Sequence, residues 1–167
     1  TQGVQLDVRP DGWEQVAGPY AEPGYRSVAD VVDPDSLQYV YDALAILRKE
    51  LGLNKTLLGF AGSPWTLACY LVEGGGSEDF PKTKALVKSN PRMLHRLLET
   101  LATAVAEYLT RQFAAGADAI QIFDSWAGAL DGADYEEFSL RYIRAVLERL
   151  PAGAPVILYA KGKSPQA

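Results

Sequence analysis

The chain has 167 residues, of which 48% are hydrophobic and 22% are charged, the composition of a globular protein with one core. Its net charge of −5 and scattered basic residues exclude an overall basic surface, so no nucleic-acid partner is expected, and a polyanion would need a local pocket. No apolar run reaches the roughly 18 residues that span a bilayer, and there is no secretory signal pattern. We therefore expect a cytoplasmic protein without a membrane span.

Cysteine and histidine are scarce. Cys69 is the single cysteine, which excludes an intrachain disulfide, and His95 is the single histidine. A zinc site built from these two residue types would have too few ligands. We expect no metal and no cofactor.

The first half of the chain predicts a helix, a strand and a second helix. Asp33 and Pro34 suit a helix start, and Gly52 suits its end. The apolar residues of this helix keep three- and four-residue spacing: Leu37, Val40, Tyr41, Leu44 and Leu47. Residues 56–60 predict a buried strand, and residues 65–72 a short helix. Three glycines at 74–76 favour a surface turn over a flexible lid.

The second half continues the alternation. Residues 81–89 predict a short helix, and Asn90 with Pro91 predicts the start of the longest helix, which extends to Phe113. Strands are predicted over 119–123 and 155–160, with a helix over 135–150 between them. The alternation indicates an α/β fold with a parallel sheet, either doubly wound or part of a barrel. In such folds ligands bind at the carboxyl ends of the strands.

Three motifs carry a resemblance. The first is Gly-Phe-Ala-Gly-Ser-Pro-Trp-Thr-Leu at 59–67, followed by Tyr70, Glu73 and the three glycines. The second is Phe-Asp-Ser-Trp-Ala-Gly at 123–128, and the third ends in Tyr-Ala-Lys-Gly at 159–162. In this order they resemble the uroporphyrinogen decarboxylase family, and the similarity runs through nearly the whole chain.

The resemblance implies a (β/α)8 TIM barrel that acts as a carboxy-lyase. Its members remove carboxylate from the four acetate side chains of uroporphyrinogen III and give coproporphyrinogen III, a step of haem biosynthesis. They work without metal or cofactor, because the protonated pyrrole ring accepts the electrons released as carbon dioxide leaves. The protein supplies orientation and electrostatic stabilisation. A homodimer is also implied.

The resemblance also implies the roles of four residues. Tyr70 matches the active-site tyrosine, whose hydroxyl would bond near the reacting acetate. Ser125 matches a hydroxyl that binds a substrate carboxylate. Phe60 matches an aromatic wall of the cleft, and Gly62 a position where a side chain would obstruct the macrocycle.

Neighbours of these residues have competing interpretations. Asp124 lies beside Ser125 and is a candidate catalytic acid, but strand alternation points it away from Ser125, so we favour a structural role in which it faces the helical layer or caps a loop. Trp65 and Trp126 are interpreted as packing residues, although either could line the cleft. Lys161 at a strand tip is either a counter-charge for a polyanion or the ion-pair partner of a neighbouring acid, and both alternatives stay open.

His95 and Cys69 are not expected to take part in chemistry. His95 lies beside the apolar stripe of the longest helix, which indicates a surface or boundary position. Cys69 has no paired histidine that would activate its thiol, so we interpret it as a packing residue.

The length of the chain sets it apart from the family. A (β/α)8 barrel needs about 250 residues, so we expect residues 1–167 to be a single domain segment, the central part of an incomplete barrel within a longer protein. The family's central aspartate, N-terminal arginines and C-terminal histidine motif would then lie outside it. Two alternatives remain: a related corrinoid or thiol methyltransferase barrel, and a catalytically inactive fragment with exposed sheet edges.

Overall fold

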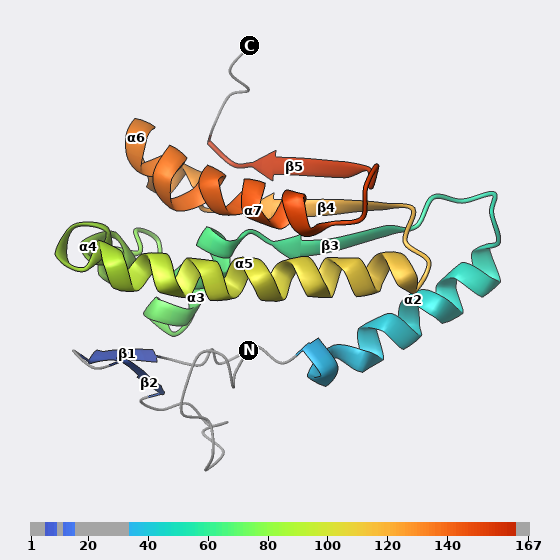
Figure 1. The fold of residues 1–167 in the computed structure, drawn as a ribbon, viewed down its shortest axis with the longest axis horizontal. Helices are drawn as coiled ribbons and strands as arrows, with labels where there is room; N and C mark the ends of the chain where they lie inside the picture. Colours follow the sequence, from blue (N-terminus) through green and yellow to red (C-terminus); the bar gives the residue numbers. More distant parts are fainter. Residues whose placement is uncertain (1–5, 10–11, 16–33, 163–167) are drawn as a thin grey trace.

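The computed structural model describes residues 6–9, 12–15 and 34–162 (Figure 1). Its centre is a parallel sheet in the order β3-β4-β5, formed by β3 (Leu58–Gly62), β4 (Ala119–Asp124) and β5 (Val156–Ala160). A separate antiparallel pair consists of β1 (Leu6–Arg9) and β2 (Gly12–Gln15). Helices connect each parallel strand to the next, which confirms the predicted α/β class.

The helices occupy the predicted regions. Ahead of the sheet lie η1 (Pro34–Leu37) and α2 (Gln38–Leu51). The connection from β3 to β4 consists of α3 (Pro64–Glu73), α4 (Pro81–Ser89) and α5 (Pro91–Ala114). The connection from β4 to β5 consists of η2 (Ala127–Ala129), α6 (Gly132–Tyr135), η3 (Glu136–Leu140) and α7 (Arg141–Arg149). Asp33, the expected first cap, lies outside the described residues.

Local side-chain bonds explain where α3 and α5 begin. The Ser63 hydroxyl accepts a hydrogen bond from the backbone N–H of Thr66 at 3.0 Å, and Pro64 occupies the first turn of α3. The Asn90 side chain accepts from the N–H of Met93 at 3.3 Å, ahead of Pro91. The predicted cap of the longest helix is therefore confirmed.

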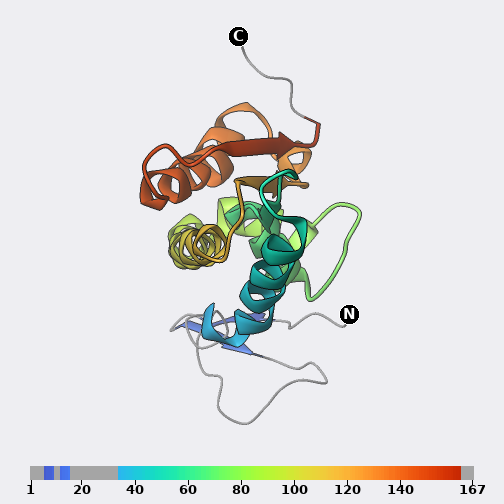
Figure 2. The ribbon, with the colours of Figure 1, turned by 90° about the vertical axis from the view of Figure 1, so that its right-hand side faces the viewer.

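Helices α5 and α7 contact each other and lie on the same side of the sheet (Figure 2). On this face the side chains of Ile120 and Ile122 are fully buried, and Val146 of α7 joins the same core. The buried and half-buried positions of β4 alternate along the strand. Alternation of side chains across a strand explains this pattern, since only every second residue faces the helices.

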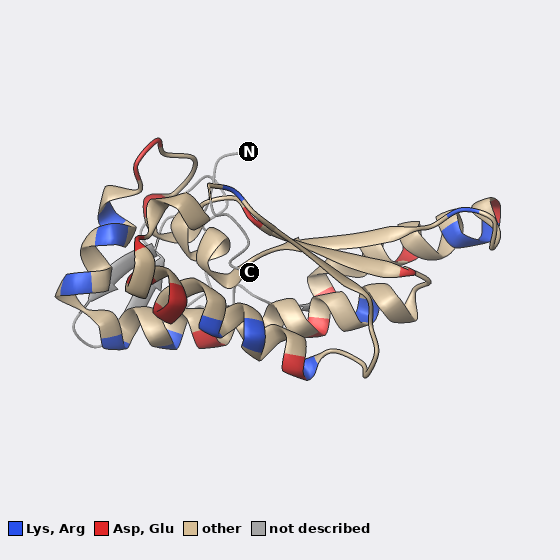
Figure 3. Ribbon diagram, turned by 90° about the horizontal axis from the view of Figure 1, so that it is seen from above, with Lys and Arg blue, Asp and Glu red and all other residues tan. Residues whose placement is uncertain are grey.

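The other face of the sheet carries exposed apolar side chains. Leu58 and Phe60 of β3 are exposed, as are Ile157 and Tyr159 of β5. The sequence predicted a fully buried strand at residues 56–60. On this face of the sheet the prediction is wrong, because Phe60 is 61% exposed among the described residues. The three parallel strands β3, β4 and β5 contain a single charged residue, Asp124, whereas many charged residues lie on the helices (Figure 3).

Strand β3 begins two residues later than predicted. The paired register with β4 starts at Leu58, opposite Ala119. Just before it, the backbone N–H of Leu57 donates to the Asp118 carboxylate at 2.7 Å, and the Leu57 carbonyl accepts from the Asp118 N–H at 2.8 Å. Further along, the buried Gln112 side chain from α5 bonds both backbone groups of Phe60, at 2.9 Å to its N–H and 3.0 Å to its carbonyl. The contacts that Asp118 and Gln112 make with β3 come from residues far away in sequence. Local apolar periodicity could therefore not locate the first residue of the strand.

The helix predicted over residues 135–150 is divided by a π-helical stretch, η3. This stretch contains the buried residues Phe138 and Ser139. The Ser139 hydroxyl donates to the Asp124 carboxylate at 2.6 Å. Leu47, which the sequence predicted on the apolar stripe of the first helix, is exposed instead, and so is the apolar Leu147 of α7.

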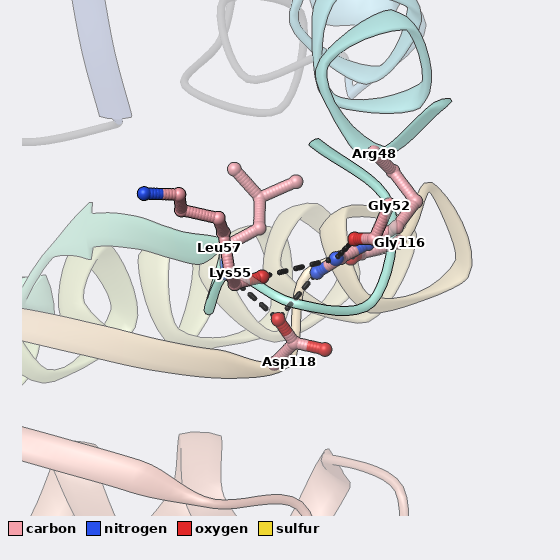
Figure 4. Close-up of polar contacts among 6 residues, drawn as sticks. All are labelled: Arg48, Gly52, Lys55, Leu57, Gly116 and Asp118. Carbon is pink, nitrogen blue, oxygen red and sulfur yellow. Dashed lines mark hydrogen bonds and ion pairs between the residues drawn. The ribbon is translucent and has the colours of Figure 1, made fainter. Parts of the chain in front are cut away.

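The N-terminal ends of β3 and β4 are joined by Arg48 of α2 (Figure 4). Its guanidinium donates to the backbone carbonyls of Gly116 at 2.9 Å, Gly52 at 2.6 Å and Lys55 at 3.2 Å, and it pairs with the Asp118 carboxylate. A Cβ atom at Gly116 would lie 2.9 Å from the Arg48 side chain, so the bare glycine permits this approach.

Within the described ranges, no helix is long and apolar enough to cross a membrane.

Candidate active site

The C-terminal ends of the three parallel strands lie next to one another. The N–H of Ser63, after β3, donates to the Phe123 carbonyl at 2.8 Å, and the N–H of Lys161, after β5, donates to the Asp124 carbonyl at 3.1 Å. The chain segments that follow β3, β4 and β5 are therefore fixed to one another. This is the edge at which α/β folds bind their ligands.

Asp124 ends β4 and is fully buried on the helical side. Its carboxylate accepts hydrogen bonds from the hydroxyls of Ser63 at 2.8 Å, Thr66 at 3.2 Å and Ser139 at 2.6 Å. These donors come from the start of α3 and from η3. The structural role predicted for Asp124 in the helical layer is confirmed, because the carboxylate connects the strand to two helical segments.

The Asp124 carboxylate also affects the titration of a neighbouring tyrosine. Burial is the main cause that raises the pKa of Tyr135 to about 12, and the nearby Asp124 charge and hydrogen bond add to it. Tyr135 therefore remains a neutral phenol at physiological pH. It belongs to the support of the site and is not an ionisable group within it.

Tyr70 lies on α3 with its side chain 38% exposed. Its ring contacts the ring of Trp126 edge-on, with centroids 6.1 Å apart, and that of Phe80 at 6.4 Å. Phe80 and Trp126 in turn lie 4.6 Å apart. The aromatic cluster holds Tyr70 beside the turn that follows β4, which carries Ser125, while its exposed part remains available to a ligand.

Ser125 is half-buried in the turn directly after β4. Among the described residues its hydroxyl has no hydrogen-bond partner, in contrast to the neighbouring Asp124, whose carboxylate accepts from the hydroxyls of Ser63, Thr66 and Ser139 and is also bonded to Tyr135. The structure thus brings Tyr70 and Ser125 to the same end of the sheet, through the shared neighbour Trp126. Their roles toward a substrate stay predictions.

Phe60 and Gly62 lie on the exposed face of β3. The Phe60 ring contacts Phe123 at 6.0 Å, and Phe123 contacts Tyr159 at 5.9 Å, so an aromatic row crosses all three strands. A Cβ atom at Gly62 would lie 3.1 Å from Leu67 Cδ2, so this glycine also leaves room for Leu67 of α3. Strand β4 links this row to the Tyr70 cluster, since it supplies Phe123 and leads into Trp126.

Three further residues lie where the sequence predicted. Trp65 is fully buried, and its indole N–H donates to the Trp126 carbonyl at 3.0 Å. Cys69 is fully buried, and burial raises the pKa of its thiol, which suits a packing residue. His95 lies at the boundary of the helical layer, where its ring stacks on Phe138 at 4.7 Å and bonds the Tyr142 hydroxyl at 2.7 Å.

No group of three or more histidine, cysteine, aspartate or glutamate side chains that could hold a metal ion occurs within residues 6–9, 12–15 and 34–162. The polar groups available to a ligand at the strand ends are hydroxyls and an ammonium group, from Tyr70, Ser125 and Lys161. Such groups bind carboxylates through hydrogen bonds and charge.

Comparison with known proteins gives the family. A model of uroporphyrinogen decarboxylase matches residues 3–167. This chain belongs to the uroporphyrinogen decarboxylase family. A uroporphyrinogen decarboxylase from Ralstonia pickettii is 48% identical over 162 residues, which cover 89% of this chain and 44% of the relative. One from Neisseria meningitidis is 51% identical over 137 residues, covering 79% of this chain and 39% of that relative.

The chain spans less than half the length of these uroporphyrinogen decarboxylases. A solved structure, a methyltransferase from Methanosarcina mazei, superimposes with a TM-score of 0.69 at 20% identity, covering 96% of this chain and 47% of the other. At 20% sequence identity this similarity shows a shared fold and does not indicate a shared function. Together with the family match it confirms the predicted α/β fold that forms part of a (β/α)8 barrel.

Sequence reasoning missed several residues of the site in this family member. Phe123 and Tyr159 extend the aromatic row, and Ser63 and Ser139 hold Asp124. Phe123 could have been found, since it is two residues before Ser125 on an alternating strand. Ser139 could not, because it meets Asp124 from a different element, fifteen positions further along the chain.

Proposed function

We propose that the full protein containing this chain is a uroporphyrinogen decarboxylase, which removes carboxylate from the four acetate side chains of uroporphyrinogen III without a cofactor. The observation that carries the proposal is the family match over residues 3–167, whose motifs meet at one end of the sheet. The Ser125 hydroxyl, which bonds no described residue, and the exposed Tyr70 support it, since both suit a polycarboxylate. Residues 1–167 would act as a single domain segment of the barrel.

Each residue has a defined part in this proposal. The Tyr70 hydroxyl donates a hydrogen bond near the reacting acetate and acts as the catalytic tyrosine. Ser125 donates to a second carboxylate and fixes the macrocycle. Phe60, with Phe123 beside it, forms an apolar wall, and Gly62 leaves room for the ring. The protonated pyrrole accepts the electrons as the carbon–carbon bond breaks, so the chain contributes orientation and electrostatic stabilisation.

The test uses the full protein. Incubation with uroporphyrinogen under reducing conditions, without added metal, should give products with seven to four carboxylates, separated by chromatography. Tyr70→Phe and Ser125→Ala should each lower kcat/KM by about 10- to 100-fold, the loss of one good hydrogen bond to a charged group. Tyr39→Phe and Ser89→Ala remove the same groups from exposed positions on α2 and α4 and serve as controls.

A folded full protein that gives no such products would refute the proposal. Wild-type kinetics in both Tyr70→Phe and Ser125→Ala would refute the residue roles and leave the activity in place. The isolated 167-residue chain is proposed to be inactive, and its conversion of uroporphyrinogen would contradict this.

A related corrinoid or thiol methyltransferase is the second candidate. The similarity to a methyltransferase structure favours it, although the low identity makes that a likeness of fold. Methyl transfer to a thiol or corrinoid by the full protein, without tetrapyrrole products, would establish it. Homodimer formation and a cytoplasmic location are further proposals that rest on the family resemblance.

A further inference from the structure

Lys161 lies at the C-terminal end of β5, beside the turn that carries Ser125 and Trp126. Its ammonium nitrogen is 5.6 Å from the centroid of the Trp126 ring, a cation–π arrangement. The side chain is exposed, and no described carboxylate lies within ion-pairing distance of it. The sequence left two roles open for Lys161, a counter-charge for a polyanion or the ion-pair partner of a neighbouring acid. Among the described residues, Lys161 has no such ion pair.

The backbone of Lys161 is held in place. Its N–H donates to the Asp124 carbonyl at 3.1 Å. The next residue, Gly162, has a φ of +79°, which favours glycine, and a Cβ atom there would lie 3.3 Å from the Cα of Gly128. The loops after β4 and β5 therefore touch at two glycines, and this contact fixes the base of the lysine beside Trp126.

The Trp126 ring is also fixed, because it packs against Phe80 at 4.6 Å and Tyr70 at 6.1 Å. The ring thus has Tyr70 as one neighbour and the Lys161 ammonium as another. Ser125 and Lys161 directly follow the paired residues Asp124 and Ala160, so they lie next to each other at the strand ends. A hydroxyl and an ammonium at adjacent positions can bind one carboxylate together.

We propose that Lys161 is a substrate-binding residue whose ammonium pairs with a carboxylate of the tetrapyrrole, and that Trp126 is its positioning residue. The proposal rests on the proposed function, which supplies a substrate with several carboxylates. Because the chain carries a net charge of −5, a polyanion needs a local positive group at the point of binding. Lys161 is such a group. No carboxylate among the described residues pairs with its ammonium and would compete with a carboxylate of the ligand.

The experiment measures steady-state decarboxylation of uroporphyrinogen by the full protein. Lys161→Met removes the charge and keeps most of the side-chain length, so KM should rise by about 10- to 100-fold while kcat changes less than threefold. Lys161→Arg should restore most of the affinity, since it keeps the charge. Trp126→Phe keeps an aromatic ring but weakens the cation–π contact, and KM should rise by about two- to fivefold.

Lys55→Met is the matched control. Lys55 is exposed at the opposite end of the sheet, and Figure 4 shows its side chain directed away from Arg48. The same change of charge there should leave KM and kcat as in the wild type. Added salt should raise KM for the wild type and for Lys55→Met, and should raise it less for Lys161→Met.

The outcomes separate this inference from the proposed function. If the wild type decarboxylates the substrate and Lys161→Met keeps its KM within twofold, the carboxylate-binding role is wrong and the function stands. If Lys161→Met lowers kcat alone, or Lys161→Arg is as impaired as Lys161→Met, the role is likewise refuted. If the folded wild type gives no product, the proposed function fails and this inference fails with it.

Discussion

The two ends of the parallel sheet use their polar groups differently. At the N-terminal end Arg48 bonds three backbone carbonyls and pairs with Asp118, which also accepts from Leu57 (Figure 4). At the C-terminal end Asp124 is equally well bonded, yet its neighbour Ser125 has no hydrogen-bond partner among the described residues. At the N-terminal end these groups bond one another, whereas at the C-terminal end a bonded carboxylate lies next to a hydroxyl that bonds no described residue.

This difference follows the general division of labour in β/α barrels, where one end of the strands stabilises the fold and the other carries the chemistry. In this chain the division occurs within two consecutive residues. Because neighbours on a strand face opposite sides, Asp124 can secure the helices while Ser125 stays available. Substitutions at the two ends should therefore separate stability from binding.

The largest effect is expected at Asp124. Asp124→Ala leaves the hydroxyls of Ser63, Thr66 and Ser139 without their buried acceptor, and it should lower the free energy of unfolding by about 3–5 kcal/mol. Urea denaturation of the full protein measures the change. Asp124→Asn, which keeps the shape and one acceptor oxygen, should lose less. Equal stability of Asp124→Ala and the wild type would show that the C-terminal end does not depend on this carboxylate.

Arg48→Met should have the second largest effect. Methionine keeps the apolar stem but leaves three backbone carbonyls and the Asp118 carboxylate without their donor, so the thermal midpoint should fall by a few degrees. Differential scanning calorimetry measures the midpoint. The KM for uroporphyrinogen should not change, since the network lies at the opposite end of the sheet. A raised KM at unchanged stability would contradict the separation of the two ends.

A smaller effect is expected from acid. The backbone N–H of Leu57 is the main cause that holds the pKa of Asp118 below its ordinary value, and Arg48 adds to it. A lowered pKa means that the stabilisation is complete above the unfolded-state pKa of about 3.9 and is lost as the pH falls through the folded-state value. The stability difference between wild type and Asp118→Asn should therefore shrink below about pH 3.9. A difference that stays constant down to pH 2 would refute this.

The smallest effect on stability is expected at Ser125. Ser125→Ala removes a hydroxyl that bonds no described residue, so the free energy of unfolding should stay within about 0.5 kcal/mol of the wild type. The same denaturation experiment measures it, with Ser63→Ala as the comparison, because the Ser63 hydroxyl is bonded to Asp124. A loss at Ser125 as large as that at Ser63 would assign Ser125 to the fold.

Much of the fold could be predicted from local patterns. Apolar spacing and caps located the helices, because a residue such as Asn90 acts on backbone groups three residues away. Alternation along β4 also predicted that Asp124 faces the helices. The fold class followed from the order of helices and strands.

The remainder depends on contacts between distant segments. An apolar strand has the same sequence whether one face or both are covered, so the apolar pattern alone did not predict the exposure of Phe60, which only the family resemblance implied. The π-helical stretch forms where Ser139 meets Asp124, fifteen positions earlier in the chain. The Lys161 contact with Trp126 needs the close approach of Gly128 and Gly162, which no local pattern indicates.

Gln112 has a consequence for self-association. Ser63 and Leu57 bond backbone groups on the β4 side, so by alternation the N–H and carbonyl of Phe60 point to the opposite edge of β3. An exposed strand edge is a template for aggregation, because unpaired backbone groups recruit another chain. The amide of Gln112 occupies both groups of Phe60 and interrupts that template in the middle of the strand. The Gln112 side chain thus makes the two backbone groups of Phe60 unavailable for pairing with another chain.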